Sequence, residues 1–131
     1  MLGPDDVQRL LDAGHLFDEM PTDEFASMFL EGGGSHCLIA YVEGTAAGFV
    51  TGIELRHPDK APEMLLYELG VDPEFRGRGI GRSLVAELQT IAAERGYRGM
   101  WVLTEEDHEP AIATYRSSGA RDPETALLFE W

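Results

Sequence analysis

One strand–turn–helix stretch decides the fold of this chain: EMLLYELGVDPEFRGRGIGRSLV, residues 63–85. Residues 63–72 are apolar at both sets of alternating positions, which predicts a strand that is buried on both faces and central in its sheet. Gly70 within that strand indicates a bulge or a close approach of another backbone. Apolar side chains then recur at helical spacing from Ile80, so a helix begins among the glycines of the turn and ends at Gly96.

The turn itself has the composition of an anion site. Three arginines and three glycines lie within residues 76–82, in a chain of formal net charge −14. Unpaired amides at a helix start attract anions, and glycines let the backbone approach closely. The turn does not match the nucleotide-triphosphate loop, which requires Gly at the position of Arg76 and Lys at the position of Arg82. It does not match the dinucleotide-binding fingerprint either, which requires Gly at the position of Leu84. The alternative is an arginine-rich surface turn at an ordinary helix start.

The rest of the 131-residue chain is expected to complete a single domain, residues 1–131. Helices are predicted over residues 4–19, from a cap at Thr22 through Glu31, and over 110–119. Strands are predicted over residues 36–43, 46–55, 99–106 and 125–131, the first two forming a hairpin around Gly44 and Thr45. Because helices alternate with strands in the second half, the class is α/β or α+β with some parallel pairing.

Composition narrows the partners and the compartment. Twenty-four acidic residues against ten basic ones exclude a nucleic-acid partner, which needs a basic face. This acidity is compatible with a cationic substrate, but composition alone favours the simpler explanation that it serves solubility. There is one cysteine, Cys37, expected in the core, and no stretch predicts a signal peptide or a membrane contact. We therefore expect a cytoplasmic protein.

The motif Arg76-x-x-Gly79-x-Gly81 after a strand resembles the pyrophosphate-binding motif of the Gcn5-related N-acetyltransferases (GNAT), which hold acetyl-CoA there. Four segments, LGPDDVQRLLDAGHLF, AAGFVTGIEL, MLLYELGVDPEFRGRGIGRSLV and EPAIATYRSSGA, resemble the aminoglycoside 3-N-acetyltransferase branch of that superfamily. The resemblance implies a mixed, mostly antiparallel sheet flanked by helices. The family's first strand is apparently missing, since only Met1 and Leu2 remain for it, and the loop over residues 20–23 is short where an acceptor-lining segment is expected.

Two residues are candidates for proton transfer. Glu68 is the only charge between Met64 and Val71, and burial would raise its pKa toward the range useful for a base. Alternatively Glu68 points into a wet cleft or pairs with an arginine. Tyr115 lies on the buried face of the last helix together with Ile112. Most tyrosines in such a position are core residues without a catalytic role. The resemblance implies that an acidic residue acts at the position of Glu68 and that Tyr115 is the general acid for the leaving thiolate.

The resemblance also assigns binding roles. Coenzyme binding is expected at ten residues: Leu69, Val71, Arg76, Gly77, Arg78, Gly79, Ile80, Gly81, Arg82 and Ser83. An acceptor could be held by the acidic stretch before the last helix, for which helix-start chemistry is an equal explanation: Glu105, Glu106, Asp107, His108 and Glu109. No Cys/His cluster has metal-ligand spacing.

The expected function is acetyl transfer from acetyl-CoA to an aminoglycoside-like amine, by direct transfer in a ternary complex. The alternatives are transfer to a polyamine, a protein lysine or a protein N-terminus, or a catalytically silent acyl-CoA-binding module. A homodimer is possible by the same resemblance, because an exposed sheet edge favours pairing with a second chain.

Overall fold

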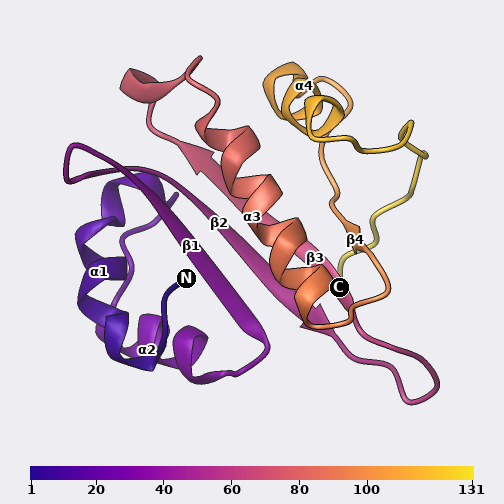
Figure 1. The fold of residues 1–131 in the computed structure, drawn as a ribbon, viewed down its shortest axis with the longest axis horizontal. Helices are drawn as coiled ribbons and strands as arrows, with labels where there is room; N and C mark the ends of the chain where they lie inside the picture. The colour runs from indigo at the N-terminus through magenta and orange to yellow at the C-terminus, as the bar shows by residue number, and fades with distance from the viewer.

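The computed structural model describes all 131 residues and has one four-stranded sheet in the order β1-β2-β3-β4 (Figure 1). The strands are β1 (Ser35–Val42), β2 (Thr45–Leu55), β3 (Glu63–Val71) and β4 (Met100–Trp101). The first three are antiparallel to one another, while β4 is parallel to β3. This mixed, mostly antiparallel sheet flanked by helices confirms the expected fold class.

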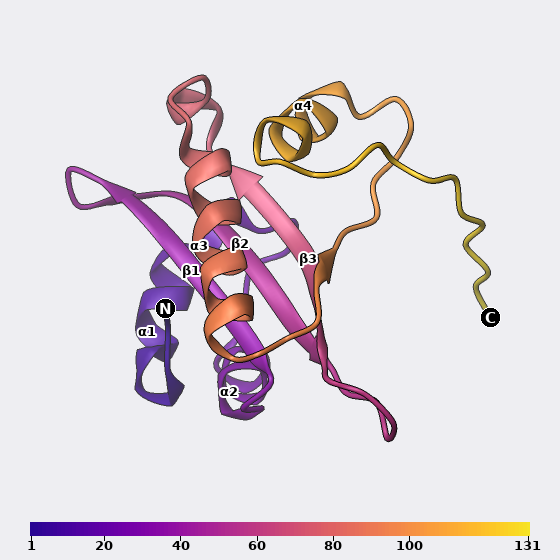
Figure 2. The same ribbon diagram turned by 45° about the vertical axis from the view of Figure 1, so that its right-hand side comes forward.

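Helices cover both faces of the sheet (Figures 1 and 2). Helices α1 (Val7–Asp12) and α2 (Asp23–Glu31) pack on one face against Cys37 and Ile39 of β1. Helix α3 (Ile80–Glu94) covers the other face, where Val50, Met64 and Leu66 are buried, and α4 (Glu109–Ser117) lies beside α3. Alternate residues of the strands therefore face two separate cores. No helix in the structure has the length and apolar character needed to cross a membrane.

The predicted hairpin between β1 and β2 is confirmed, with its turn one residue earlier than the expected Gly44 and Thr45. Its two turn residues, Glu43 and Gly44, both have positive φ, 50° and 81°. A two-residue turn of this kind matches the twist of paired strands. The predicted second helix is also confirmed, because the Thr22 side chain accepts a hydrogen bond from the Phe25 amide at the start of α2.

The N-terminal helix is shorter than the predicted residues 4–19. It is divided into a 3-10 turn (Pro4–Asp6), α1, and a second 3-10 turn (Gly14–Leu16). The chain folds back on itself here, since a Cβ at Gly14 would lie 2.8 Å from Cε of Met20. Ahead of the first 3-10 turn, the Leu2 amide donates one hydrogen bond of 2.9 Å to the Cys37 carbonyl of β1.

Two predicted strands differ in the structure. Strand β4 is only two residues long rather than spanning residues 99–106, and residues 125–131 form no strand. Residues 120–131 are all exposed and extend away from the sheet (Figure 2). A strand requires a neighbour for its backbone hydrogen bonds, and none lies beside this segment in the single chain.

Strand β3 contains the predicted irregularity at a different residue. Thr51 pairs with Glu68 and Gly52 pairs with Leu66, so the extra residue of the bulge is Tyr67 rather than Gly70. Gly70 is a site of close approach instead: a Cβ there would lie 3.3 Å from the Leu16 backbone carbonyl oxygen, as predicted, and 2.6 Å from the Phe49 ring. The bulge changes the face of the sheet to which the next side chain, Glu68, points.

Candidate active site

The site begins where β3 and β4 separate. The two strands are paired only at Met64 with Met100 and at Leu65 with Trp101. Beyond Leu65, β3 continues beside β2 alone, so the edge of β3 that faces away from β2 has no strand neighbour. Leu69 and Val71, two of the expected coenzyme contacts, lie along this open part of β3. Unpaired backbone groups at such an edge can hydrogen-bond an extended ligand.

The arginine–glycine turn connects the end of β3 to α3 and has free backbone donors. Gly77 and Gly79 have φ of 77° and 79°, a left-handed conformation that favours glycine. The first hydrogen bond of α3 runs from the Ser83 amide to the Gly79 carbonyl at 3.0 Å. The amides of the preceding helix residues therefore have no intrahelical partner, and no acidic side chain stands in the first turn of α3 to occupy them.

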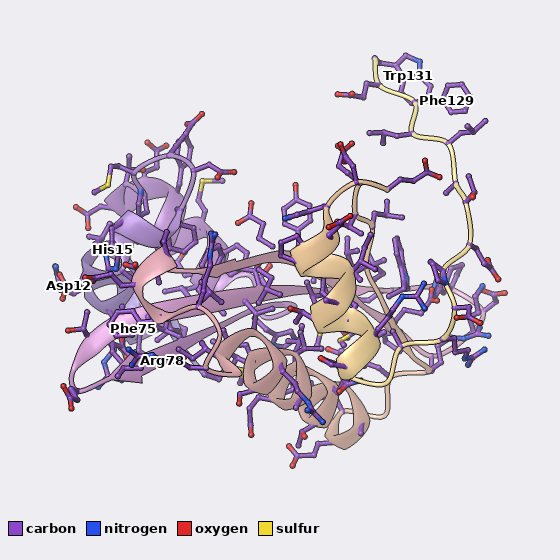
Figure 3. The ribbon with its side chains drawn as sticks, turned by 90° about the horizontal axis from the view of Figure 1, so that it is seen from above. Asp12, His15, Phe75, Arg78, Phe129 and Trp131 are labelled. Carbon is purple, nitrogen blue, oxygen red and sulfur yellow. The ribbon has the colours of Figure 1, made fainter.

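The three arginines of the turn add charge that no carboxylate of the chain neutralises. None of the guanidinium groups of Arg76, Arg78 and Arg82 forms an ion pair, and all three side chains are exposed. Arg76 donates from Nε to the Val71 carbonyl at 3.2 Å, which holds the turn against the end of β3. Arg78 lies over the Phe75 ring, 5.3 Å from its centroid (Figure 3). The turn therefore offers an anion its unpaired backbone amides and two exposed guanidinium groups that have no carboxylate partner, those of Arg78 and Arg82.

Glu68 lies on the α1–α2 face of the sheet because of the bulge at Tyr67. Met64 and Leu66 face α3, and strict alternation would have put Glu68 with them in the core. Instead Glu68 lines a cavity on the opposite face, and its amide donates to Oγ1 of Thr51 at 3.0 Å. The Glu68 side chain is exposed to this cavity and forms no ion pair. Of the two alternatives given above for Glu68, the structure therefore shows the position in a cleft and not the pairing with an arginine.

The environment of Glu68 suits a base. Partial burial raises the pKa of Glu68, and the negative charge of Asp18 raises it further. Asp18 lies in the loop between α1 and α2, which no sequence pattern singled out. The charge of Asp18 raises the pKa of Glu68 only because the fold brings that loop close to β3.

The cavity beside Glu68 has a volume of about 170 Å³ and mostly apolar walls. Its lining residues come from the two N-terminal helices, their connecting loop and the central strands: Leu10, Phe17, Pro21, Phe25, Ala26, Phe29, Thr51, Tyr67 and Glu68. The sequence analysis missed the aromatic members, because Phe25 and Phe29 at helical spacing resemble an ordinary core stripe. Phe25 and Tyr67 are nevertheless largely exposed, which identifies them as walls of a cavity and not as core.

Tyr115 lies on α4 and packs against the core cluster under α3, which also contacts Leu69 of β3. Burial raises the pKa of the Tyr115 hydroxyl, so the group stays protonated at neutral pH. None of the side-chain hydrogen bonds of the structure uses this hydroxyl, so its proton is available to a ligand. The structure thus places Tyr115 on the α3 side of the open β3 edge and Glu68 on the α1–α2 side.

The acidic stretch Glu105 to Glu109 lies on the connection between β4 and α4. All five of its residues are exposed, and none lines the cavity beside Glu68. Within the stretch, the His108 amide donates to the Glu105 carbonyl and the Glu109 amide to the Asp107 carbonyl, as at an ordinary helix start. The acidic side chain that the fold brings close to Glu68 is Asp18 instead.

The sequence is similar to those of known acetyltransferases. The sequence model of the acetyltransferase (GNAT) family matches residues 5–120. An acetyltransferase of Yersinia pestis (strain Pestoides F) is 32% identical over 91 residues, which cover 70% of this chain and 61% of that protein. The mycothiol acetyltransferase of Clavibacter sepedonicus is 42% identical over 57 residues, covering 44% of this chain and 19% of that protein. The chain therefore matches only part of the length of these curated relatives.

Solved structures agree in fold. The aminoglycoside acetyltransferase meta-AAC0020 from an uncultured soil metagenomic sample superposes with a TM-score of 0.91 at 22% identity, covering 99% of this chain and 91% of that one. Another soil metagenomic aminoglycoside acetyltransferase, HMB0005, gives a TM-score of 0.81 at 27% identity, covering 99% and 95%. The family match over residues 5–120, with an open strand edge leading into an arginine–glycine turn, leads to one conclusion: this chain belongs to the acetyltransferase (GNAT) family.

Proposed function

We propose that this chain transfers the acetyl group of acetyl-CoA to a primary amine, with Glu68 as the base and Tyr115 as the acid. The observation that carries the proposal is the arrangement along β3. A carboxylate with a raised pKa, an open backbone edge and an anion-binding turn follow one another within residues 68–83. In chain order, these three features would contact the acceptor amine, the thioester arm of the coenzyme and its pyrophosphate.

Acetyl-CoA would supply an acyl carbon on a good thiolate leaving group. The chain's own contributions are the following. The turn and its arginines bind the pyrophosphate, and the open edge at Leu69 and Val71 orients the arm. The Glu68 carboxylate takes the proton of the acceptor ammonium, directly or through water, which leaves a nucleophilic amine in the cavity. Attack of this amine on the thioester carbon forms the C–N bond and breaks the C–S bond, and Tyr115 Oη, on the opposite side of the strand, gives its proton to the departing thiolate. Cys37 takes no part, because it is buried and burial raises the pKa of its thiol to about 12.

The favoured acceptor is an aminoglycoside-like polycation, acetylated at an amine of its central ring as in the 3-N-acetyltransferase branch. Three observations support this choice. The chain resembles that branch in four segments. Proteins of similar fold carry the name aminoglycoside acetyltransferase, and one of them, AAC(6')-Iy, was solved with the bisubstrate analogue CoA-S-monomethyl-acetylneamine. The net charge of −14, with Glu68 lining the cavity, the charge of Asp18 acting on Glu68, and the exposed Glu105 to Glu109 stretch, would attract a cation.

A protein amine is the second candidate acceptor. The apolar and aromatic walls of the cavity, including Phe25 and Tyr67, would suit the side chains of a peptide as well as the carbon face of a sugar ring. A ribosomal-protein-alanine N-acetyltransferase from Brucella melitensis has a similar fold, with a TM-score of 0.74 at 22% identity.

A product assay with gentamicin-type aminoglycosides, spermidine and a lysine peptide, side by side, tests these proposals. We expect acetylated aminoglycoside, with an apparent KM that rises with salt while kcat changes little, because screening weakens long-range attraction. The position of the new amide, read by NMR, tests the 3-N assignment. Activity on the peptide alone, indifferent to salt, would overturn the aminoglycoside proposal and leave acetyl transfer intact. Binding of acetyl-CoA without transfer to any amine would overturn the catalytic proposal itself.

A further inference from the structure

The segment between α1 and α2 runs along the end of β3, in the direction opposite to the strand. We call residues 15–18 the bridging segment. Its residues lie at positions counted backwards from the end of β3: His15 at Asp72, Leu16 at Gly70 and Asp18 at Glu68. The segment therefore extends from the start of the arginine–glycine turn to the cavity beside Glu68.

His15 is held at the start of β2, next to Asp72. The Nε2 atom of His15 lies 3.0 Å from the Ala46 carbonyl oxygen, and since a carbonyl only accepts, Nε2 is the nitrogen that donates. The Asp72 amide donates to the following carbonyl of β2, that of Ala47, at 2.8 Å. Neighbouring carbonyls of β2 therefore hold the two residues together, with 3.8 Å between Nε2 of His15 and Oδ2 of Asp72.

Asp72 is also the first residue of the arginine–glycine turn. Its Oδ1 accepts a hydrogen bond from the Glu74 amide, and its carbonyl accepts one from the Phe75 amide, both at 2.9 Å. These bonds form a 3-10 turn that comes directly before the first arginine. Figure 3 shows His15 at the same end of the molecule as Phe75 and Arg78. The position of Asp72 therefore fixes where the turn leaves β3, and His15 lies against this residue.

The other end of the bridging segment forms part of the cavity beside Glu68. The Phe17 ring lines this cavity and packs against Phe49 of β2, with 4.2 Å between the ring centroids and 36° between the ring planes. The next residue, Asp18, carries the negative charge that raises the pKa of Glu68. A displacement of the segment would therefore change both the wall of the cavity and the charge acting on Glu68.

We propose that His15 is a positioning residue that couples the arginine–glycine turn to the cavity beside Glu68 through the bridging segment. Four residues span at most roughly 13–14 Å when fully extended, so the two ends of the segment cannot move independently. An anion that orders the turn would restrain Asp72 and His15, and with them the cavity wall. The coupling is reciprocal, so an amine held in the cavity would strengthen anion binding by the same factor. The identity of the two ligands rests on the function proposed above, whereas the contacts of His15 do not.

Titration of the Glu68 carboxyl by NMR, in the chain without ligands, tests the role of His15 directly. His15→Phe keeps a ring but removes the donor to Ala46, so the bridging segment loses its anchor. The pKa of Glu68 should then fall toward its ordinary value, because burial and the Asp18 charge, the two causes of its rise, both weaken. An unchanged pKa of Glu68 in His15→Phe would overturn the proposal.

Two further variants separate this role from a general loss of packing. His15→Gln can place an amide N–H near the position of Nε2 and should restore the pKa of Glu68 to its wild-type value. His57→Phe is the matched control, because Nε2 of His57 also contacts a carboxylate, that of Glu63 at 2.7 Å, but on the connection between β2 and β3. It should leave the pKa of Glu68 unchanged. A fall of the same size in His57→Phe would overturn the assignment to His15.

Hydrogen exchange with and without CoA tests the coupling to the turn. CoA should slow the exchange of the Leu16 and Phe17 amides, which both donate to backbone carbonyls, by about fivefold or more in the wild type. His15→Phe should lose this slowing while the amides of the turn remain protected. CoA binding that leaves exchange in the wild-type segment unchanged would overturn the coupling alone. A chain that binds no CoA by calorimetry would overturn both the coupling and the function proposed above.

Discussion

The amide of Glu68 donates a hydrogen bond to Oγ1 of Thr51 at 3.0 Å, and this contact fixes the direction of the Glu68 side chain. The two residues are cross-strand partners on β3 and β2 at the point where the register shifts by one residue. If β3 alternated regularly, without the bulge at Tyr67, Glu68 would share the α3 face with Met64 and Leu66. The proposed base therefore depends on a buried threonine in the neighbouring strand.

Thr51→Val should lower both stability and activity. Thr51 is buried, so an isosteric valine would leave the Glu68 amide without its partner, at a cost of about 1–3 kcal/mol in the free energy of unfolding. Thr51→Ser keeps the hydroxyl and serves as the control. Urea unfolding and initial rates would measure the two effects. Equal rates and stabilities for the valine and serine variants would show that the bulge does not need this hydrogen bond.

Glu68→Gln should lower kcat by roughly a hundredfold, because the amide keeps the shape of the side chain but cannot accept the ammonium proton. The melting temperature should be unchanged or higher. The reason lies in the raised pKa: the folded state holds the Glu68 proton more tightly than the unfolded chain, so ionisation at neutral pH lowers the free energy of unfolding. A folded variant whose kcat falls less than about threefold would assign Glu68 a structural role.

Asp18→Asn should shift the acidic limb of the pH–rate profile to lower pH. Removing the negative charge of Asp18 takes away the second cause of the raised Glu68 pKa, while the first cause, partial burial, remains. The base is then ionised over a wider range, so activity at acidic pH rises relative to the plateau. Glu19→Gln, one residue along the same loop, is the control and should leave the limb in place. An unmoved limb in Asp18→Asn would contradict the assignment of that limb to Glu68.

Tyr115→Phe should lower kcat with little change in melting temperature, because the ring still packs against the α3 core while the proton is lost. Tyr97→Phe is the matched control, since Tyr97 contacts the same core cluster and burial also raises its pKa, but its hydroxyl lies 3.4 Å from Nε2 of His36, away from the open β3 edge. A stability loss with normal turnover in Tyr115→Phe would make Tyr115 a core residue.

Gly81→Asp should weaken acetyl-CoA binding without unfolding the chain. A Cβ at Gly81 has its nearest neighbour, Cγ2 of Thr114, at 3.4 Å, so the side chain fits, but its carboxylate would occupy the free amides at the start of α3. Gly99→Asp adds the same charge at a glycine with open surroundings and is the control. Calorimetry showing equal affinity for the two variants would exclude the turn as the pyrophosphate site.

The sequence by itself determined the elements that depend on local pattern. The β3–turn–α3 stretch, the cap at Thr22, the hairpin at Gly44 and the helix opened by Pro110 follow from alternation, helical spacing and turn residues, which act over a few residues. The anion turn and the two proton-transfer candidates could be named for the same reason, since their residue types are unusual in their local setting.

Only the tertiary structure decided the direction of Glu68, the charge beside it and the fate of residues 125–131. The alternation of β3 placed Glu68 with the core side chains, and the bulge opposite Thr51 turned it to the cavity. Asp18 and the aromatic walls reach Glu68 through contacts between segments that are distant in sequence. Residues 125–131 have the apolar character of a strand, but a strand forms only where a neighbour offers its backbone, and the single chain offers none there.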